Sequence, residues 1–288
     1  MTTPREPLAV VTGASTGMGA ATAAELARQG FHVLAGVRRD TDGDTIRADG
    51  VEPVILDITE PDQVAALAAR VAADHRPLAA LINNAGIQVN GPVEALPMAE
   101  WRRTFEVNFF GHIAMTQALL PALLRSKGRV LNISSIGGKV AMPTYGAYAG
   151  AKFALEAVSD ALRREVAPFG VHVIVVEPGG VRTEIAHRGV ATANHLAAQM
   201  TPDQEGRYGG LVHAINTLME TGTASGLTPE AAARIIAKAV TARRPRTRYT
   251  IGRDAAMLIG LARFLPDRTL DRVSAANLRR HYPKAAAA

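Results

Sequence analysis

The sequence contains no cysteine, which excludes disulfide bonds, thiolate metal sites and thiol catalysis. Aromatic residues are also scarce, at 5% of 288 residues. No apolar run approaches the roughly 18 residues that would predict a membrane-spanning helix. His187, His195 and His213 lack the spacing of metal ligands, so no metal site is expected. The first residues lack the charged head and apolar core of a signal peptide, and these features together predict a cytoplasmic protein.

The chain does have an excess of basic residues, with 32 Lys and Arg against 26 Asp and Glu and a net charge of +6. Nucleic-acid binding is one explanation of such an excess. However, the arginines are scattered, and only the stretch RRPRTR at 243–248 forms a cluster. Because no nucleic-acid-binding motif surrounds that cluster, no nucleic-acid partner is expected.

Short apolar stretches alternate with helical patterns along most of the chain, and 48% of the residues are hydrophobic. Expected strands are 8–13, 31–37, 51–58, 78–86, 128–135, 171–180 and 247–252. Expected helices are 17–30, 61–75, roughly 97–126, 146–168 and 228–243. This alternation predicts parallel strands joined by right-handed crossovers, and the continuous apolar strands predict a sheet covered on both faces. The fold class is therefore α/β, with a doubly wound, mostly parallel sheet.

The domain organisation is expected to be simple. Residues 1–288 are interpreted as one catalytic domain, because no linker and no repeat divides them. Residues 253–288 are expected to form a helical extension at the C-terminal end, and 284–288 a frayed tail.

A glycine-rich loop, TGASTGMG at 12–19, lies between the first expected strand and the first expected helix. Gly13 permits a tight turn there. Gly17 and Gly19 are expected to let the backbone approach a phosphate at the helix N-terminus, where free N–H groups and the helix dipole favour an anion. Ser15, Thr16 and Met18 complete the candidate phosphate-binding loop.

The spacing of these glycines, followed in order by LDI, NNAG, VNFFG, NISS, YGAYAGAKFAL and EPGGVRT, resembles the short-chain dehydrogenase/reductase family. The resemblance covers most of residues 8–252. It implies a Rossmann-type fold, a nicotinamide cofactor, and oxidation or reduction of a small-molecule alcohol or carbonyl compound. The stretch 152–180 is most similar to the branch that includes retinol dehydrogenases and 17β-hydroxysteroid dehydrogenases. That similarity implies a bulky apolar substrate.

The residues after the second strand favour NADP over NAD. In this family an acidic residue at the position of Val37 bonds the ribose 2′-hydroxyl of NAD, and valine cannot do so. Arg38 and Arg39 follow, and either guanidinium can pair with the 2′-phosphate of NADP. Ser15 is a further donor for that phosphate. The alternative is that one or both arginines are solvated, with Asp40 neutralising one of them.

The resemblance assigns further cofactor contacts at the ends of later strands. Asp57 is expected to bond the adenine amine and Ile58 to cover the ring, with a helix cap as the alternative role of Asp57. The remaining contacts are expected near the ribose and the nicotinamide, at Asn84, Ala85, Gly86, Pro178, Gly179, Val181 and Thr183.

The stretch YGAYAGAKFAL at 145–155 contains two tyrosines and one lysine. Tyr148 and Lys152 are four residues apart, so they share one face of a helix. Tyr145 and Lys152 are two turns apart, too far for direct contact. An ammonium group beside a phenol lowers the pKa of the phenol, which makes Tyr148 the candidate for proton transfer. Tyr145 is expected to pack near the site entrance or to bond the backbone.

The family resemblance completes the catalytic set. Ser135 matches the serine that bonds the substrate carbonyl, whereas Ser134, one residue earlier, should point to the other face of the strand. Asn108 matches the asparagine that anchors a water in a proton relay. Lys152 is also implied to hold the nicotinamide ribose. Long helices at about 97–126 and 146–168 commonly pair between subunits in this family, so a homodimer or homotetramer is expected.

The rest of the chain leaves several alternatives open. Residues 185–227 are expected to form the substrate lid. The amphipathic stretch 254–273 is expected to pack in an oligomer, with closure over the pocket and membrane contact as alternatives. A 3-oxoacyl-thioester reductase is the alternative activity, because Arg182 and Arg188 would suit a phosphorylated substrate arm. A non-catalytic NADP-binding regulatory protein is the alternative of another class.

Overall fold

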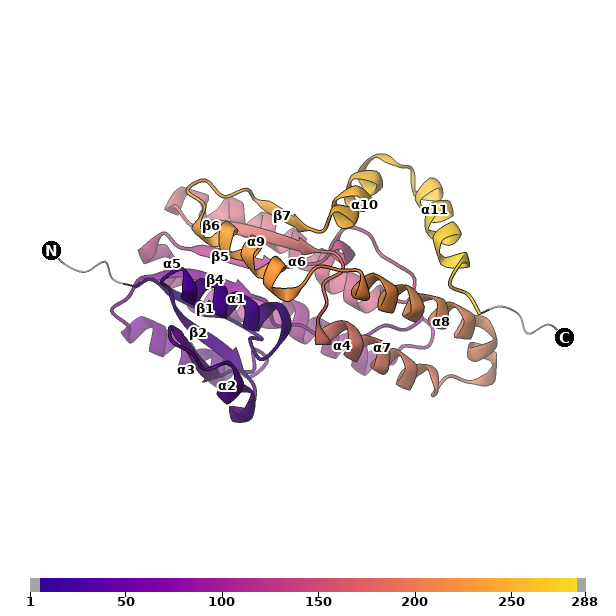
Figure 1. Cartoon of the computed structure of the whole chain (residues 1–288), viewed down its shortest axis with the longest axis horizontal. Helices are drawn as coiled ribbons and strands as arrows, with labels where there is room; N and C mark the ends of the chain where they lie inside the picture. Colours follow the sequence, from indigo (N-terminus) through magenta and orange to yellow (C-terminus); the bar gives the residue numbers. More distant parts are fainter. Residues whose placement is uncertain (1–5, 284–288) are drawn as a thin grey trace.

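The computed structural model describes residues 6–283, and its centre is a seven-stranded parallel sheet (Figure 1). The strand order is β3-β2-β1-β4-β5-β6-β7, which confirms the predicted doubly wound α/β fold. The strands are β1 (Leu8–Val11), β2 (His32–Val37), β3 (Val51–Ile55), β4 (Leu78–Asn83), β5 (Arg129–Ile133), β6 (His172–Pro178) and β7 (Arg248–Ile251).

Helices fill the connections between the strands. They are α1 (Gly17–Arg28), α2 (Asp40–Ile46), α3 (Pro61–Ala73), α4 (Met98–Phe105), η1 (Glu106–Phe110), α5 (Gly111–Ser126), η2 (Ile136–Gly138), α6 (Gly146–Val166), η3 (Ala167–Phe169), α7 (Glu184–Ala197), α8 (Pro202–Ala224), α9 (Pro229–Thr241), α10 (Arg253–Phe264) and α11 (Asp267–Arg279). The short polar helix α2 was not predicted, because its sequence DTDGDTI lacks an apolar face.

Alternating side chains of each strand enter two separate cores. In β1, Ala9 and Val11 join the core that lies under α1 and α9. Leu8 and Val10 join the core on the opposite face, under α3 and α5. This alternation follows from the two-residue period of a strand, and it explains why the strands are apolar at every position.

The strands end earlier than the sequence pattern predicted. β1 ends at Val11, β3 at Ile55, β4 at Asn83 and β5 at Ile133. The residues after these ends turn away from the ladder to form loops at the carboxyl edge of the sheet. The strand order reverses between β1 and β4, and doubly wound sheets bind ligands in the crevice beyond such a reversal.

The long helix expected at 97–126 consists of three segments, because a π-helical turn, η1, separates α4 from α5. Among the described residues, 98–126 is the one helical stretch long and apolar enough, by length and composition, to cross a membrane. The sequence analysis missed it because polar residues interrupt the apolar run. Met115, Leu119 and Leu123 of α5 are buried in the core beneath β4, and this packing accounts for part of the apolar composition.

Four helices of the C-terminal part lie outside the strand–helix alternation. Residues 185–227, the expected lid, contain α8 and all but the first residue of α7, and the C-terminal extension contains α10 and α11. Figure 1 shows α10 and α11, in yellow, on the same side of the molecule as α8, and α8 contacts α11. The expectation for 284–288 falls outside the described residues.

Candidate active site

The loops after β1 and β4 are joined by hydrogen bonds at the point where the strand order reverses. The Thr12 hydroxyl accepts hydrogen bonds from the backbone N–H groups of Asn84 and Ala85, both at 3.0 Å. The Asn84 amide donates to the carbonyl oxygens of Thr12, at 2.9 Å, and Gly13, at 3.0 Å. The first glycine of the loop is therefore fixed against the end of β4.

The glycine-rich loop has the backbone that its sequence predicts. Gly13 and Gly17 adopt positive φ angles of 63° and 58°, which favour glycine. At the start of α1, the Thr16 side chain makes no capping hydrogen bond and the first turn has no acidic residue. This end of the helix therefore presents uncapped N–H groups, which fit the phosphates of a dinucleotide.

Gly19 also has a packing role that was not predicted. A Cβ atom at Gly19 would lie 2.2 Å from the carbonyl oxygen of Gly13 and 2.5 Å from the amide nitrogen of Asn84. Gly19 is thus required for packing of the helix against its own loop.

A cavity of about 750 Å³ joins the predicted cofactor residues to the predicted catalytic residues. Ten predicted residues line it: Met18, Asn84, Gly86, Ser135, Tyr148, Lys152, Pro178, Gly179, Val181 and Thr183. Apolar side chains from α8, α10 and α11 form its outer walls, among them Leu218, Met257 and Leu261. The cavity thus has a polar inner end and an apolar outer part. The helices α10 and α11 line it, which favours the pocket-covering alternative for the C-terminal segment over the expected packing in an oligomer.

Tyr148, Lys152 and Ser135 meet at the inner end of this cavity. Ser135 is the N-cap of η2, where its hydroxyl accepts a hydrogen bond from the N–H of Gly137 at 3.0 Å. The Lys152 ammonium donates to the carbonyl oxygen of Ile133 at 2.8 Å and lies 5.9 Å from the centre of the Tyr148 ring. A Cβ atom at Gly137 would lie 3.2 Å from the Tyr148 ring, so this glycine, which the sequence analysis missed, lets η2 approach the tyrosine.

Burial shifts the pKa values of Tyr148 and Lys152. It raises the pKa of Tyr148, and hydrogen bonding with Ser135 opposes the rise. In this structure burial therefore outweighs the lowering of the Tyr148 pKa that was predicted from Lys152, whose ammonium lies 5.9 Å from the ring centre and is bonded to a carbonyl oxygen. Burial also lowers the pKa of Lys152 to about 8, while the charge of Glu156 raises it.

Tyr145 is buried and bonded to side chains rather than to the backbone. Its hydroxyl accepts a hydrogen bond from the Gln88 amide at 3.2 Å and contacts the sulfur of Met219 on α8. Its ring packs edge-on against Tyr148, with 6.0 Å between the ring centres. Burial raises the pKa of Tyr145, so its proton is held firmly. Tyr145 lines the cavity beside Tyr148 and, as predicted, makes no direct contact with Lys152.

The side chain of Asn108 holds the loop after β4. Its amide oxygen accepts a hydrogen bond from the N–H of Ile87 and its amide nitrogen donates to the carbonyl oxygen of Ile87, both at 2.8 Å. Asn108 lies in the π-turn η1, which directs this side chain toward the loop. Nearby, the buried His112 ring bonds the carbonyl oxygen of Ala85 at 2.7 Å, and burial lowers its pKa to about 3. The sequence analysis missed this neutral histidine.

The two arginines after β2 differ in their partners. Arg39 forms a bidentate ion pair with Asp42 on α2, at 2.8 and 2.9 Å, and not with Asp40, the partner considered in the alternative. Arg38 is exposed and makes no hydrogen bond or ion pair within residues 6–283. The guanidinium of Arg38 is therefore available to a ligand.

Asp57 lies in the turn between β3 and α3. One carboxylate oxygen accepts hydrogen bonds from the backbone N–H and the hydroxyl of Thr59, at 3.0 and 2.7 Å. This turn is not the helix cap considered as the alternative role, because Glu60 and not Asp57 is the N-cap of α3. The other carboxylate oxygen remains for a ligand, and Ile58 beside it is buried in the core.

Comparison with known proteins decides the family. The profile of the short chain dehydrogenase family matches residues 7–194, about two thirds of the chain. The chain belongs to this family. Retinol dehydrogenase 5 of Mus musculus is 36% identical to this dehydrogenase over 276 residues, which cover 91% of this chain and 86% of the relative. Estradiol 17-beta-dehydrogenase 2 of Mus musculus is 34% identical over 282 residues, covering 92% and 73%. The predicted branch is thereby confirmed.

A solved structure extends the comparison. A short chain dehydrogenase from Burkholderia cenocepacia, determined in complex with NADP, superposes with a TM-score of 0.71 at 27% identity. The match covers 97% of this dehydrogenase and 99% of that chain. The predicted enzyme class, an NAD(P)-dependent short-chain dehydrogenase/reductase, is confirmed by the family.

The loop after β6 crosses the end of α8 in close contact. A Cβ atom at Gly180 would lie 2.5 Å from the carbonyl oxygen of Gly222, and one at Gly226 would lie 2.5 Å from Gly180. Leu227 pairs with the loop, donating to the carbonyl of Gly180 at 3.0 Å and accepting from the N–H of Arg182 at 2.9 Å. The chain at the end of α8 is therefore anchored to the segment that carries Val181. Within residues 6–283, no three His, Asp or Glu side chains group as a metal site.

Proposed function

We propose that this dehydrogenase transfers a hydride between NADP(H) and the carbonyl or secondary alcohol group of a bulky apolar molecule. The observation that supports this most directly is the cavity, in which Ser135, Tyr148 and Lys152 lie at the inner end and apolar side chains form the outer walls. A carbonyl group at the inner end would reach the hydroxyl groups while the rest of the substrate lies among apolar side chains.

Each polar residue has a proposed role in the chemistry. The nicotinamide supplies or accepts the hydride. Tyr148 donates a proton to the forming alkoxide in reduction and accepts it in oxidation. Ser135 donates a hydrogen bond to the same oxygen and fixes its position. Lys152 holds the ribose and, as an ammonium close to the phenol, favours loss of the Tyr148 proton when the site is assembled. Asn108 is proposed to anchor the water that connects Lys152 to solvent.

The proposed cofactor is NADP, held by the residues that the sequence analysis assigned to it. Val37 is buried and has no group that could bond a ribose hydroxyl. Arg38 is the free cation next to it, and the Burkholderia relative was determined with NADP. A charge-assisted contact between guanidinium and 2′-phosphate is the physical basis of this preference.

The proposed substrate is apolar rather than a 3-oxoacyl thioester. Neither Arg182 nor Arg188, the two residues that suggested a phosphorylated substrate arm, lines the cavity, where Arg280 is the arginine in the lining. Methionine and leucine side chains from α8 and α10 line it instead, among them Met219, Met257 and Leu258. Residues 185–227 and the helices α10 and α11 are proposed to act together as the lid.

A cofactor-oxidation screen tests the proposal. NADPH oxidation is followed at 340 nm with apolar ketones and aldehydes, including steroid and retinoid carbonyls, and with β-ketoacyl thioesters as the comparison set. We expect turnover with the apolar ketones or aldehydes and little with the thioesters. Turnover confined to thioesters would instead support the alternative activity, reduction of a 3-oxoacyl thioester. No turnover with any carbonyl would contradict the proposed hydride transfer.

We also expect a homodimer or homotetramer. Three large apolar side chains are exposed on adjoining helices: Met98 on α4, Phe110 on η1 and Phe153 on α6. Light scattering at micromolar concentration should give twice or four times the chain mass of 30.4 kDa. Phe153→Glu should lower that mass, because it places a charge in the interface. Ile55→Glu, a matched change at an exposed edge-strand residue, should not. A monomeric wild-type protein would contradict this.

The cytoplasmic location stays a prediction.

A further inference from the structure

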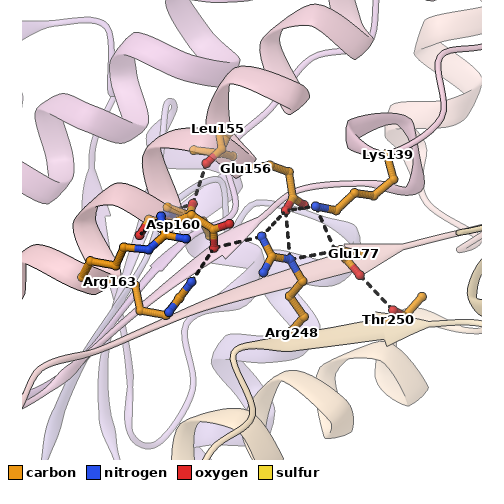
Figure 2. Close-up of polar contacts among 11 residues, drawn as sticks. Lys139, Leu155, Glu156, Asp160, Arg163, Glu177, Arg248 and Thr250 are labelled. Carbon is orange, nitrogen blue, oxygen red and sulfur yellow. Dashed lines mark hydrogen bonds and ion pairs between the residues drawn. The ribbon is translucent and has the colours of Figure 1, made fainter. Parts of the chain in front are cut away.

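A network of ion pairs lies beside the catalytic group and outside its proposed chemistry (Figure 2). It contains three acids, Glu156 and Asp160 of α6 and Glu177 of β6, and three bases, Lys139 after η2, Arg163 of α6 and Arg248 of β7. Arg248 is the last residue of the basic cluster RRPRTR, so the structure gives that residue a buried partner in place of a nucleic-acid contact.

Glu156 is the centre of this network. Its side chain is buried, and one carboxylate oxygen lies 2.7 Å from the ammonium of Lys139 and 3.1 Å from the guanidinium of Arg248. Its other oxygen is buried and has no hydrogen-bond partner among the described residues. One oxygen of the Glu156 carboxylate is thus paired with two cations, while the other has no hydrogen-bond partner among the described residues.

Glu177 connects the network to β6 and β7. It accepts a hydrogen bond from the Thr250 hydroxyl at 2.9 Å, and the guanidinium of Arg248 lies 3.3 Å from its other oxygen. Burial raises the pKa of Glu177. The next residue in the chain is Pro178, which lines the cavity.

Stability alone gives a poor reason for this arrangement. Removing charges from water costs several kcal/mol per ion, and well-packed apolar residues often stabilise a core as well or better. What distinguishes Lys139, Glu156 and Glu177 is their position in the chain. Lys139 follows Ser135 by four residues, Glu156 follows Lys152 by one helical turn, and Glu177 immediately precedes Pro178. The network therefore joins the three segments that carry the groups at the inner end of the cavity.

The contact between η2 and α6 is tight at this point. A Cβ atom at Gly138 would lie 2.7 Å from the Ser134 hydroxyl, 3.1 Å from the carbonyl oxygen of Lys152 and 3.3 Å from the Glu156 side chain. The segment that carries Ser135 is thus seated directly on the helical turn between Lys152 and Glu156. A shift of Glu156 would move both partners of Tyr148.

We propose that Glu156 is a positioning residue for the hydride transfer, acting through Lys152 and Ser135, and this inference rests on the proposed function. With Lys139 and Arg248 it fixes η2 against α6, and its carboxylate keeps a negative charge one helical turn from the Lys152 ammonium. Lys139 acts in the opposite electrostatic sense, because its positive charge offsets that carboxylate.

The charged groups around Lys152 and Glu156 determine how Glu156 affects the protonation of Lys152. The titratable and charged groups that face it are His112 of α5, Tyr148 of α6, Lys139 after η2, Glu177 of β6 and Arg248 of β7. His112 is neutral, since its pKa is about 3. The last residue of α4, Phe105, presents its uncharged ring to Gly150 on α6. Glu156 is thus the acid that favours the charged form of Lys152.

Two substitutions with opposite expected signs test the inference. Glu156→Gln removes the negative charge, so Lys152 should lose its proton at a pH lower by about one unit. Lys139→Gln removes the offsetting positive charge, so the titration should move upward, by about half a unit. Asp160→Asn is the control, because Asp160 belongs to the same network but lies two turns from Lys152 and is partly exposed. It should leave the titration unchanged.

The titration is measured directly on the folded enzyme with NADP⁺ bound, through the ¹³C shifts of its lysine side chains. The chain has five lysines, and Lys152 is assigned by the signal that disappears in Lys152→Arg. In parallel, the high-pH limb of kcat for NADPH-dependent reduction should move in the same directions. The activity of the wild-type enzyme tests the proposed function separately, and the lysine titration needs no substrate.

Opposite shifts in the two variants, with the control unchanged, support the inference. Equal losses of activity at every pH, with an unmoved Lys152 titration, would show a merely structural role and overturn it. Should Glu156→Gln fail to fold, the direction of the Lys139→Gln shift decides alone, and a downward or absent shift would refute the inference.

Discussion

Replacing Tyr148 by phenylalanine is expected to lower kcat for ketone reduction by about 10²- to 10⁴-fold. The substitution removes the hydroxyl that would give the proton to the alkoxide, and it keeps the ring that packs against Tyr145. Cofactor binding should survive, because Lys152 and the glycine-rich loop are unchanged. The measurement is kcat with the best carbonyl from the screen, together with the Kd for NADPH by fluorescence.

Tyr145→Phe is the matched control for this experiment. It removes a hydroxyl of the same kind, three residues away, whose partners are Gln88 and Met219 rather than Ser135. Its effect on kcat should be mild. If Tyr145→Phe abolished turnover while Tyr148→Phe remained active, the assignment of the proton donor would be refuted.

The cofactor preference is expected to depend on Arg38. The wild-type enzyme should bind NADPH about ten- to a hundredfold more tightly than NADH, the ratio that one charge-assisted bidentate contact provides. Arg38→Ala should remove most of this ratio by weakening NADPH binding while leaving NADH binding nearly unchanged. Both affinities are measured by fluorescence titration at one fixed salt concentration, since exposed charges are screened by salt.

Arg39→Ala provides the comparison for Arg38→Ala. The guanidinium of Arg39 is already held by Asp42 in two hydrogen bonds, so it is less available to a phosphate. Its substitution should change the NADPH-to-NADH ratio less than that of Arg38. Equal binding of the two cofactors by the wild-type enzyme, or an unchanged ratio in Arg38→Ala, would count against NADP as the cofactor.

The parts of the site that could be predicted from sequence are those fixed by local rules. Gly13 and Gly17 occupy positive φ angles that favour glycine, and their spacing marks the first strand–helix turn. Tyr148 and Lys152 lie one turn apart on α6, a relation that follows from helix geometry. Ser135 follows the end of β5 directly. Such features depend on neighbours within a few residues, so the chain order contains them.

The parts that could not be predicted depend on contacts between distant segments. Met219 reaches Tyr145 from α8, and Arg248 reaches Glu156 from β7, 92 residues along the chain. The hydrogen bonds between the Asn108 side chain and the backbone of Ile87 depend on a π-turn that the apolar pattern does not reveal. The pKa of Tyr148 rises because of burial, which only the assembled fold determines.

The packing of α9 against α1 has a consequence for synthesis of the protein on the ribosome. The helix α1 is made early and α9 late, yet Leu26 of α1 and Ile236 and Val240 of α9 share one core above β1. While the chain emerges, that face of the growing sheet remains open to water until α9 follows. Nascent chains that expose apolar surface in this way are prone to aggregation. This short chain dehydrogenase therefore acquires its protected fold only when translation is nearly complete.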